Sequence, residues 1–252
     1  MNNQATMEKM QEMRLHGMLR AFGETLGTGM QNKFTVDEMI AHLVDAEYDE
    51  RYNRKFNTLL KNAALRYKAR IEEIDFKPSR KIDKNMLLRF TSCDWIKKGE
   101  SIIITGSTGA GKSFIACALG QKACVNQFHV GYYSCMKLFS QLKYCKADGT
   151  YFKEMNKIKK QDLVILDDFG LKILDADARL MMLELLEDRH GTRSIIVTSQ
   201  IPIAKWFDII GDATIADAIC DRLIHTSHKI DIKGDSMRKG KSNNSGQKLP
   251  PD

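Results

Sequence analysis

Hydrophobic residues recur at helical spacing through residues 1–70, and no stretch there alternates as a strand does. The first amphipathic run stops at the glycines of 27–29. Thr35 and Glu38 then have the spacing of a capping box, which predicts a second helix from Val36. The pattern predicts a small helical N-terminal domain whose apolar faces pack against each other or against the next domain. The first run comprises Leu15, Met18, Leu19, Phe22 and Leu26, and the second begins with Val36, Met39, Ile40, Leu43, Val44 and Tyr48.

The pattern changes near residue 101 to short apolar runs, rich in β-branched residues, that alternate with helical runs. A less regular connecting segment over 71–98 precedes this region, and the domain boundary is expected between 65 and 80. The alternation predicts an α/β fold over 99–232, with a five-stranded parallel sheet covered by helices on both faces. The tail over 233–252 has no apolar face and is expected to be flexible. The expected strands are 102–105, 130–134, 163–166, 194–198 and 229–232.

The first of these strands ends in a glycine-rich loop, GSTGAGKS, that leads into a helical run. The loop matches the P-loop pattern GxxxxGK followed by Ser or Thr at every fixed position. Glycines let backbone N–H groups wrap phosphates, and the following helix directs its positive dipole end at the same anion. We therefore expect Lys112 to reach the β- and γ-phosphates of a nucleoside triphosphate and Ser113 to bind Mg²⁺. The nucleotide-binding residues are Gly106, Ser107, Thr108, Gly109, Ala110, Gly111, Lys112 and Ser113.

Two later strand ends carry polar residues that suit phosphate chemistry. The run LVIL at 163–166 is followed by Asp167 and Asp168, which resembles a Walker B strand after so clear a P-loop. Asp167 is expected to hold Mg²⁺ and Asp168 to polarise the attacking water, although acids after a strand also occur in solvated turns. After the next strand, Gln200 is the better candidate for orienting water, and Ser199 is more simply interpreted as a turn residue.

Charge and cysteine usage restrict the class of protein. The net charge of +7, with a pI near 9.0, suits contact with a polyanion such as nucleic acid without proving it. A basic stretch at the end of the second helix either binds nucleic-acid phosphates or is a solvated helix face. Its candidate DNA-binding residues are Arg51, Arg54, Lys55, Lys61 and Arg66.

The six cysteines form no CxxC pair, which indicates reduced thiols in a core rather than a metal site. The N-terminus has no signal-peptide pattern, and apolar runs are shorter than a membrane span. These observations predict a cytoplasmic protein with no membrane association.

The region 101–232 resembles the AAA+ ATPases, in the subgroup that contains the DnaC helicase loaders and the IstB-like transposition helpers. The motifs GSTGAGKS, LVILDDFG, IIVTSQIPIAKWFDIIGDATIADAICDRLIH and SMRKG are especially similar to the IstB-like proteins. The N-terminal motifs LHGM, DAEYDERYNRK and LLKNAALRYKARIEEIDF extend this similarity to nearly the whole chain up to about residue 241.

The resemblance implies roles for individual residues. Gln200 matches the sensor-one position, and Arg222 matches the arginine finger, a residue that completes the nucleotide site of a neighbouring subunit. Asp168 stands where many AAA+ proteins have glutamate, so the geometry of water activation does not carry over directly. Arg238 stands where a sensor-two arginine could lie.

The leading hypothesis is therefore a DNA-dependent, Mg²⁺-dependent ATPase that assembles as a homo-oligomer on double-stranded DNA and assists the transposase of the same insertion sequence. A replicative helicase loader of the DnaC type would use the same ATPase core. A small-molecule P-loop kinase would need a substrate pocket and an arginine-rich lid, and the lysine-rich segment over 143–160 shows no evident acceptor site. A nucleotide-binding switch with slow ATP turnover is a further alternative, because Asp168 is shorter than glutamate.

Overall fold

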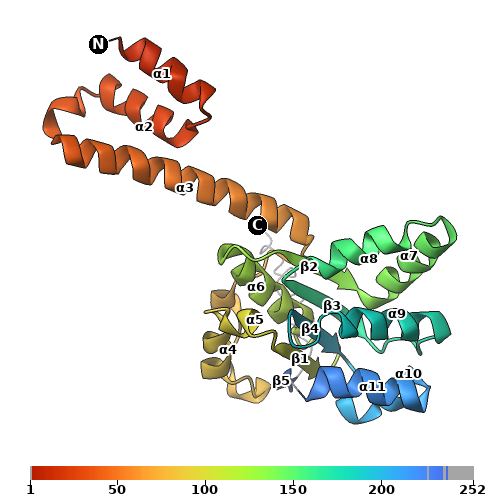
Figure 1. Cartoon of the computed structure of the whole chain (residues 1–252). Coiled ribbons are helices and arrows are strands. Elements are labelled where there is room, and N and C mark those ends of the chain that lie inside the picture. Colours follow the sequence, from red (N-terminus) through yellow and green to blue (C-terminus); the bar gives the residue numbers. More distant parts are fainter. Residues whose placement is uncertain (1, 226, 235–236, 238–252) are drawn as a thin grey trace, which may run out of the picture. The chain divides into compact units, whose positions relative to one another are not determined.

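The chain folds into two compact units, one up to Thr58 and the other from Leu59 onward. The computed structural model describes residues 2–225, 227–234 and 237 (Figure 1). The division falls inside one long helix, α3 (Val36–Ala63), upstream of the interval 65–80 expected from the sequence. Leu59 and Ala63 near the end of α3 are already buried, so the end of this helix belongs to the second unit.

The N-terminal unit consists of helices, as the spacing of its apolar residues predicts. They are α1 (Asn3–Glu12), α2 (His16–Gly27), the short 3-10 helix η1 (Met30–Lys33) and the first part of α3. The expected capping box is present, since Thr35 N–H donates to Glu38 Oε2 at 2.8 Å and Glu38 N–H donates to Thr35 Oγ1 at 3.3 Å.

Helices α2 and α3 approach closely at Gly17. A Cβ atom there would lie 2.2 Å from the carbonyl oxygen of Ala46, so a side chain cannot be accommodated. The carboxylate of Glu47 accepts hydrogen bonds from the N–H groups of Gly17 and Met18, at 2.8 and 3.2 Å. Glu47 therefore satisfies unpaired donors at the start of α2, where a negative charge is also favoured by the helix dipole.

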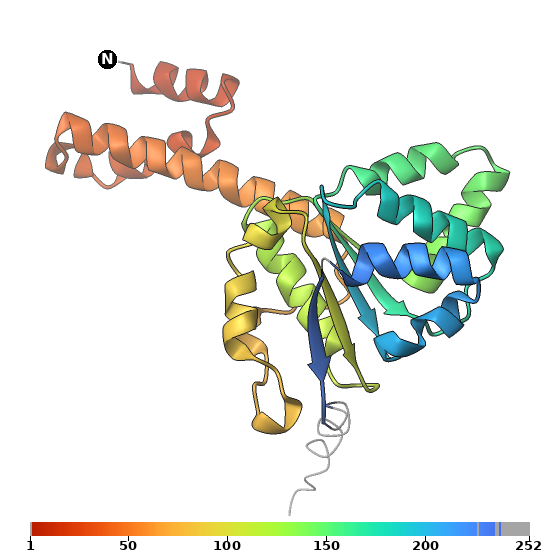
Figure 2. The same cartoon turned by 60° about the horizontal axis from the view of Figure 1, so that its bottom comes forward.

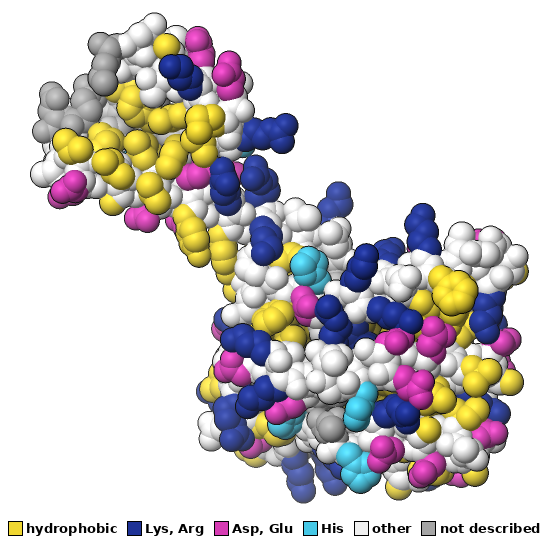
Figure 3. Space-filling model, in the orientation of Figure 1, with side chains coloured by type: hydrophobic (Ala, Val, Ile, Leu, Met, Phe, Trp, Pro, Cys, Tyr) yellow, Lys and Arg dark blue, Asp and Glu magenta, His cyan; other side chains and the backbone are white. Residues whose placement is uncertain are grey.

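The apolar stripe expected along the start of α3 is not buried. Val36 and Tyr48, at its two ends, are 76% and 67% exposed. Hydrophobic side chains also gather on the face of this unit that Figure 3 shows. The prediction that this stripe packs within the chain is therefore wrong for its outer positions. The exposed members are Val36, Ile40, Val44 and Tyr48.

The second unit is built on the predicted five-stranded parallel sheet, with strand order β2-β3-β4-β1-β5. Helix α6 with α4 and α5 covers one face, and helices α7 to α11 cover the other (Figure 2). Side chains alternate between these layers: Val164 and Leu166 join the core beneath α7–α11, while Ile165 lies next to Gly120 of α6. The strands are β1 (Ser101–Gly106), β2 (Val130–Ser134), β3 (Leu163–Phe169), β4 (Ser194–Ser199) and β5 (Ser227–Ile232).

The connections between the strands are mostly helical. Strand β3 extends further than expected, so Asp167 and Asp168 lie inside it. Before the sheet come η2 (Ile71–Glu73), η3 (Pro78–Arg80), α4 (Lys84–Phe90) and α5 (Asp94–Lys97). The others are α6 (Lys112–Val125), α7 (Cys135–Ala147), α8 (Tyr151–Lys159), α9 (Ala176–Glu187), η4 (Ile203–Lys205), α10 (Trp206–Ile210) and α11 (Ala213–Ile224).

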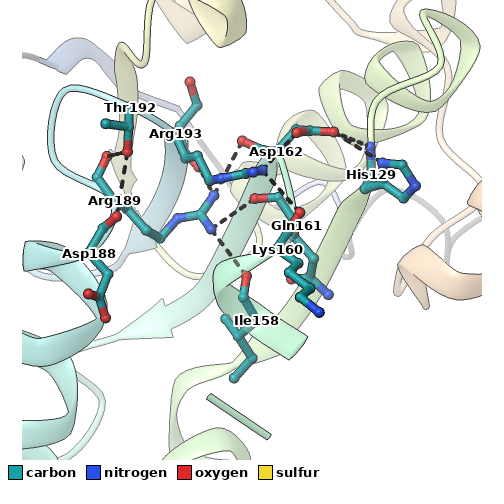
Figure 4. Close-up of polar contacts among 10 residues, drawn as sticks. His129, Ile158, Lys160, Gln161, Asp162, Asp188, Arg189, Thr192 and Arg193 are labelled. Carbon is teal, nitrogen blue, oxygen red and sulfur yellow. Dashed lines mark hydrogen bonds and ion pairs between the residues drawn. The ribbon is translucent and has the colours of Figure 1, made fainter. Parts of the chain in front are cut away.

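A buried arginine joins the elements at the amino edge of the sheet (Figure 4). Arg189 is 1% exposed. Its Nη1 donates to the carbonyl oxygens of Ile158 and Gln161, and its Nη2 to those of Asp162 and Ser194, over 2.8–3.2 Å. Burial lowers the pKa of Arg189 to about 10, so the group stays charged at neutral pH. One side chain thus connects the end of α8 with the starts of β3 and β4.

The cysteines behave as the sequence predicts, because all six are buried and free. Burial raises the pKa of the Cys117 thiol to about 11 and that of Cys124 to about 12. In the part of the chain that the structure describes, no helix combines the length and the hydrophobicity needed to span a bilayer.

Candidate nucleotide site

The loop between β1 and α6 lies at the carboxyl edge of the sheet and depends on its glycines. Gly106, Gly109 and Gly111 have φ angles of 150°, 80° and 96°, a region that side chains rarely allow. A Cβ atom at Gly106 would lie 2.4 Å from the carbonyl oxygen of Ile232 on the neighbouring strand. The predicted P-loop therefore has the backbone that the motif requires.

Arg80 supports this loop, and sequence reasoning missed it. The residue is 6% exposed, and its Nη2 donates to the carbonyl oxygen of Ala110 at 2.5 Å. The backbone carbonyl of Arg80 accepts from Lys233 N–H, at 3.1 Å, just after β5. Burial lowers the pKa of this guanidinium, against the opposing effect of Asp75. The local sequence KPSR contains no signal for this role, which depends on contacts between distant segments.

Lys112 starts helix α6 and points its ammonium back along the loop. Its Nζ donates to the carbonyl oxygens of Gly106 and Ser107, both at 2.9 Å. The residue is only 5% exposed. The cation is thus enclosed by the loop whose motif is expected to hold phosphates.

Asp167 lies at the centre of a hydrogen-bond network. It is fully buried, and its Oδ1 accepts from Ser113 Oγ at 2.7 Å and from Thr198 Oγ1 at 2.5 Å. Its Oδ2 accepts from the Tyr132 hydroxyl and from Arg66 Nη1, the latter at 3.3 Å. Burial, reinforced by the hydrogen bond of the Tyr132 hydroxyl to Asp167, raises the pKa of Tyr132. The structure brings the predicted Ser113 and Asp167 together and adds three partners that the sequence did not indicate.

Asp168 has an unusual backbone. Its φ is +61°, which is uncommon for a residue with a side chain and easier for aspartate than for glutamate. Its N–H donates to Thr198 Oγ1 at 3.0 Å, where the pairing of β3 with β4 shifts register between Leu166 and Phe169. This conformation provides a physical reason for aspartate where the AAA+ resemblance leads one to expect glutamate.

Gln200 and Ser199 have different surroundings in the structure. The Thr108 hydroxyl of the P-loop donates to Gln200 Oε1 at 2.6 Å, which places Gln200 beside the nucleotide-binding loop. Ser199 is buried, donates to the Phe169 carbonyl at 2.8 Å and accepts from Ile201 N–H at 3.1 Å. Its hydroxyl therefore supports the turn.

A cleft of about 740 Å³ joins these groups. The P-loop, the start of α6, Asp168 and Gln200 line one part, and residues 66–68, 73–75 and 80 line another. The size is in the range of sites for ligands as large as a nucleotide. Ser113 and Asp167 offer hydroxyl and carboxylate oxygens, the donor types that Mg²⁺ prefers, so these residues fit a magnesium nucleotide.

Arg222 lies away from this cleft. It is in the last turn of α11, where its Nη2 pairs with Glu187 Oε1 at 2.9 Å. Helix α11 leads into β5, and the start of β5 pairs with Ser101 at the opposite end of β1 from the P-loop. The length of β1, about 17 Å at the usual rise per residue, separates the two edges. The structure therefore does not bring Arg222 to the nucleotide site of its own chain.

The candidate DNA-binding residues lie in different surroundings. Arg51 pairs with Glu47 of the same helix, at 2.6 Å. Arg66 departs from the prediction, because it follows α3 and pairs with the acids of the nucleotide site instead of lying on the basic helix face. Arg238, the candidate sensor-two arginine and not a DNA-binding candidate, lies outside the described residues. The other candidates are exposed residues of α3, namely Arg54, Lys55 and Lys61.

Comparison with known proteins finds relatives that match most of the chain. The family model described as IstB-like ATP binding protein matches residues 8–245. The chain is 40% identical over 234 residues to the insertion sequence ATP-binding protein y4pL of Sinorhizobium fredii, covering 93% of this chain and 96% of that protein. It is 36% identical over 203 residues to the ATP-binding protein of insertion sequence IS1162 from Pseudomonas fluorescens, covering 80% and 88%.

Solved structures are similar in fold. The DnaC helicase loader matches with a TM-score of 0.56 and 17% identity, over 66% of this chain and 98% of the loader. AMPPCP-bound DnaA from Aquifex aeolicus matches with a TM-score of 0.58 and 19% identity, over 74% of this chain and 58% of that chain. These similarities confirm the expected AAA+ P-loop fold.

Proposed function

The chain belongs to the IstB-like ATP-binding proteins, and from this premise we propose that it is a DNA-dependent ATPase that assists the transposase of its insertion sequence. The relatives carry the words insertion sequence and ATP-binding in their names. The observation that carries the proposal is that Lys112, Ser113 and Asp168 line one cleft, while the buried Asp167 accepts a hydrogen bond from Ser113.

Each residue has a distinct task in this proposal. Lys112 moves its ammonium from loop carbonyls to the β- and γ-phosphates of ATP, and Ser113 and Asp167 hold Mg²⁺. When bound, Mg²⁺ would neutralise charge on the phosphate oxygens. Asp168 polarises the attacking water, and Gln200, beside Thr108, helps to orient it.

The position of Arg222 supports an oligomeric enzyme. A guanidinium at the amino edge of the sheet cannot reach the P-loop at the carboxyl edge of its own chain. It can serve the nucleotide of a neighbouring subunit, as an arginine finger does. The nucleotide site is then completed by a second copy, and ATP controls assembly.

Contact with DNA is proposed to use exposed basic residues of α3. Arg54, Lys55 and Lys61 can neutralise phosphates without reading the sequence of the bases. The net charge of +7 supports a polyanionic partner. Such binding weakens steeply as salt rises.

Assembly tests the proposal directly. Sedimentation of the full chain is measured with ATP, with double-stranded DNA and with both, at low salt. We expect the largest species with both ligands present. A chain that remains monomeric under every condition contradicts the proposal.

The Arg222→Ala variant tests the shared site. ATP affinity should stay within about twofold, because Arg222 is remote from its own P-loop, while DNA-stimulated hydrolysis should fall by about 10³-fold, the usual scale for a finger arginine. Arg179→Ala, a change of another arginine, in α9, is the control and should retain hydrolysis. Loss of binding and of hydrolysis to the same extent contradicts the finger role.

A helicase loader is the second candidate, and the similarity in fold to the DnaC loader favours it. The ATPase core would act in the same way, but the partner would be a replicative helicase. Pull-down with the transposase and with the helicase as alternative baits separates the two. If the helicase retains the chain and the transposase does not, the helicase-loader function replaces the proposed role in transposition.

A further inference from the structure

Arg66 occupies a position that the P-loop and Walker B motifs do not explain. Helix α3 ends at Ala63, and Ala64 has a φ of +49°, which breaks the helix just before Arg66. The side chain of Arg66 reaches the carboxyl edge of the sheet and lines the same cleft as Lys112 and Ser113. It comes from a segment far from both motifs in the sequence.

Its guanidinium contacts both acids of β3. Arg66 Nη1 lies 3.3 Å from Asp167 Oδ2 and 3.4 Å from Asp168 Oδ2. A single nitrogen makes both contacts, although a guanidinium has five N–H donors arranged to grip an anion from two sides. The Arg66 side chain is 44% exposed, so solvent screens these ion pairs and makes them easy to exchange.

The surroundings keep this cation in place and charged. The guanidinium carbon lies 5.4 Å from the centre of the Tyr67 ring, which itself packs near Phe114 of α6. A guanidinium cannot be deprotonated in a protein at ordinary pH. Arg66 therefore carries a permanent charge beside Asp167, which shares its other oxygen with the hydroxyl of Ser113.

We propose that Arg66 is a γ-phosphate sensor of its own subunit, which exchanges the carboxylates of Asp167 and Asp168 for the γ-phosphate of ATP. This inference rests on the proposed ATP site. In the proposed site, Ser113 and Asp167 lie on the magnesium side of the phosphates, and Asp168 lies on the side of the attacking water. The guanidinium contacts both acids, so it lies where the terminal phosphate is recognised. With ADP, which lacks that phosphate, Arg66 keeps its carboxylate partners. Release of Asp168 from Arg66 then depends on ATP.

The experiment compares the affinities of the full chain for a non-hydrolysable ATP analogue and for ADP by calorimetry, with Mg²⁺ present. Arg66→Gln removes the charge and keeps a polar side chain. We expect its affinity for the ATP analogue to fall about tenfold, the scale of one charge-assisted hydrogen bond, while its affinity for ADP stays within about twofold. Arg70→Gln, at an exposed arginine nearby in sequence, is the matched control and should leave both affinities unchanged.

Arg66→Lys provides a second variant that retains the charge. A lysine is a point charge on a flexible stem, so it should restore part of the preference for the ATP analogue. Equal changes in the two affinities, or no change in either, would overturn the inference even if the wild-type chain binds ATP. A wild-type chain that binds neither nucleotide would instead contradict the proposed function.

Discussion

The two edges of the sheet each contain a fully buried charged side chain, and the partners of these side chains differ in kind. At the amino edge, Arg189 donates to four backbone carbonyls that belong to the ends of α8, β3 and β4. At the carboxyl edge, Asp167 accepts from Ser113, Thr198, Tyr132 and Arg66, all through side chains. Backbone carbonyls cannot move without disrupting the fold, whereas hydroxyl and guanidinium groups can rotate to a ligand. Burial therefore does not distinguish a structural charge from a functional one, but the type of partner does.

The largest effect on stability should come from removing the hydrogen bonds of Arg189 at the amino edge of the sheet. Arg189→Met leaves four carbonyl groups without their donor and should lower the free energy of unfolding by about 4 kcal/mol. Urea unfolding followed by circular dichroism measures this change. Arg193→Gln is the control, since its ion pair with Asp162 is partly exposed and should contribute less than about 1 kcal/mol. If both variants lose the same free energy of unfolding, the carbonyl contacts of Arg189 contribute no more to stability than a partly exposed ion pair.

The carboxyl edge should respond in binding rather than in stability. Lys112→Ala should weaken ATP binding about 100-fold, because charge-assisted hydrogen bonds to phosphate are lost, while the unfolding midpoint changes little. Calorimetric titration and thermal unfolding measure the two quantities. Lys122→Ala, at the other end of α6, is the matched control and should bind ATP normally. A variant with a lower unfolding midpoint but an unchanged ATP affinity would show that Lys112 has a structural role. The two edges of the sheet would then not differ in this respect.

The smallest effect concerns the backbone at Asp168. Asp168→Glu should lower the free energy of unfolding by about 1 kcal/mol, since glutamate tolerates a positive φ less well than aspartate. Asp168→Asn should change it less, because asparagine also accepts this conformation. Urea unfolding without nucleotide measures both variants. A glutamate variant as stable as the original chain would remove the backbone explanation for aspartate at this position.

Much of the fold was predictable because it follows from local patterns. The alternation of apolar runs predicts five parallel strands, and all five are present with ends displaced by a few residues. The Thr35 and Glu38 capping box is also local, and it forms as expected. The exposure of the apolar stripe at the start of α3 was not predictable, because periodicity shows that a face is apolar but not what covers it.

The candidate site was predictable only in part, for the same reason. Lys112, Ser113, Asp167 and Gln200 lie at or just after the carboxyl ends of strands that meet at one edge of a parallel sheet, so their type and order indicate the site. Arg66 and Arg80 lie before the first strand, in segments with no motif, and reach the site through long-range contacts. Sequence pattern assigned Arg66 to a basic helix face because its neighbours in the chain are basic.

The sequence by itself determined the parallel α/β core, the phosphate-binding loop and the two acids, because each depends on residues close together in the chain. Only the tertiary structure decided that Arg66 joins those acids, that Arg80 supports the loop and that Arg222 lies at the opposite edge from the loop. Long side chains can reach any of several partners, and which partner they meet is set by the packing of distant segments. For arginine above all, the residue type determines the charge, and the folded structure determines which groups that charge contacts.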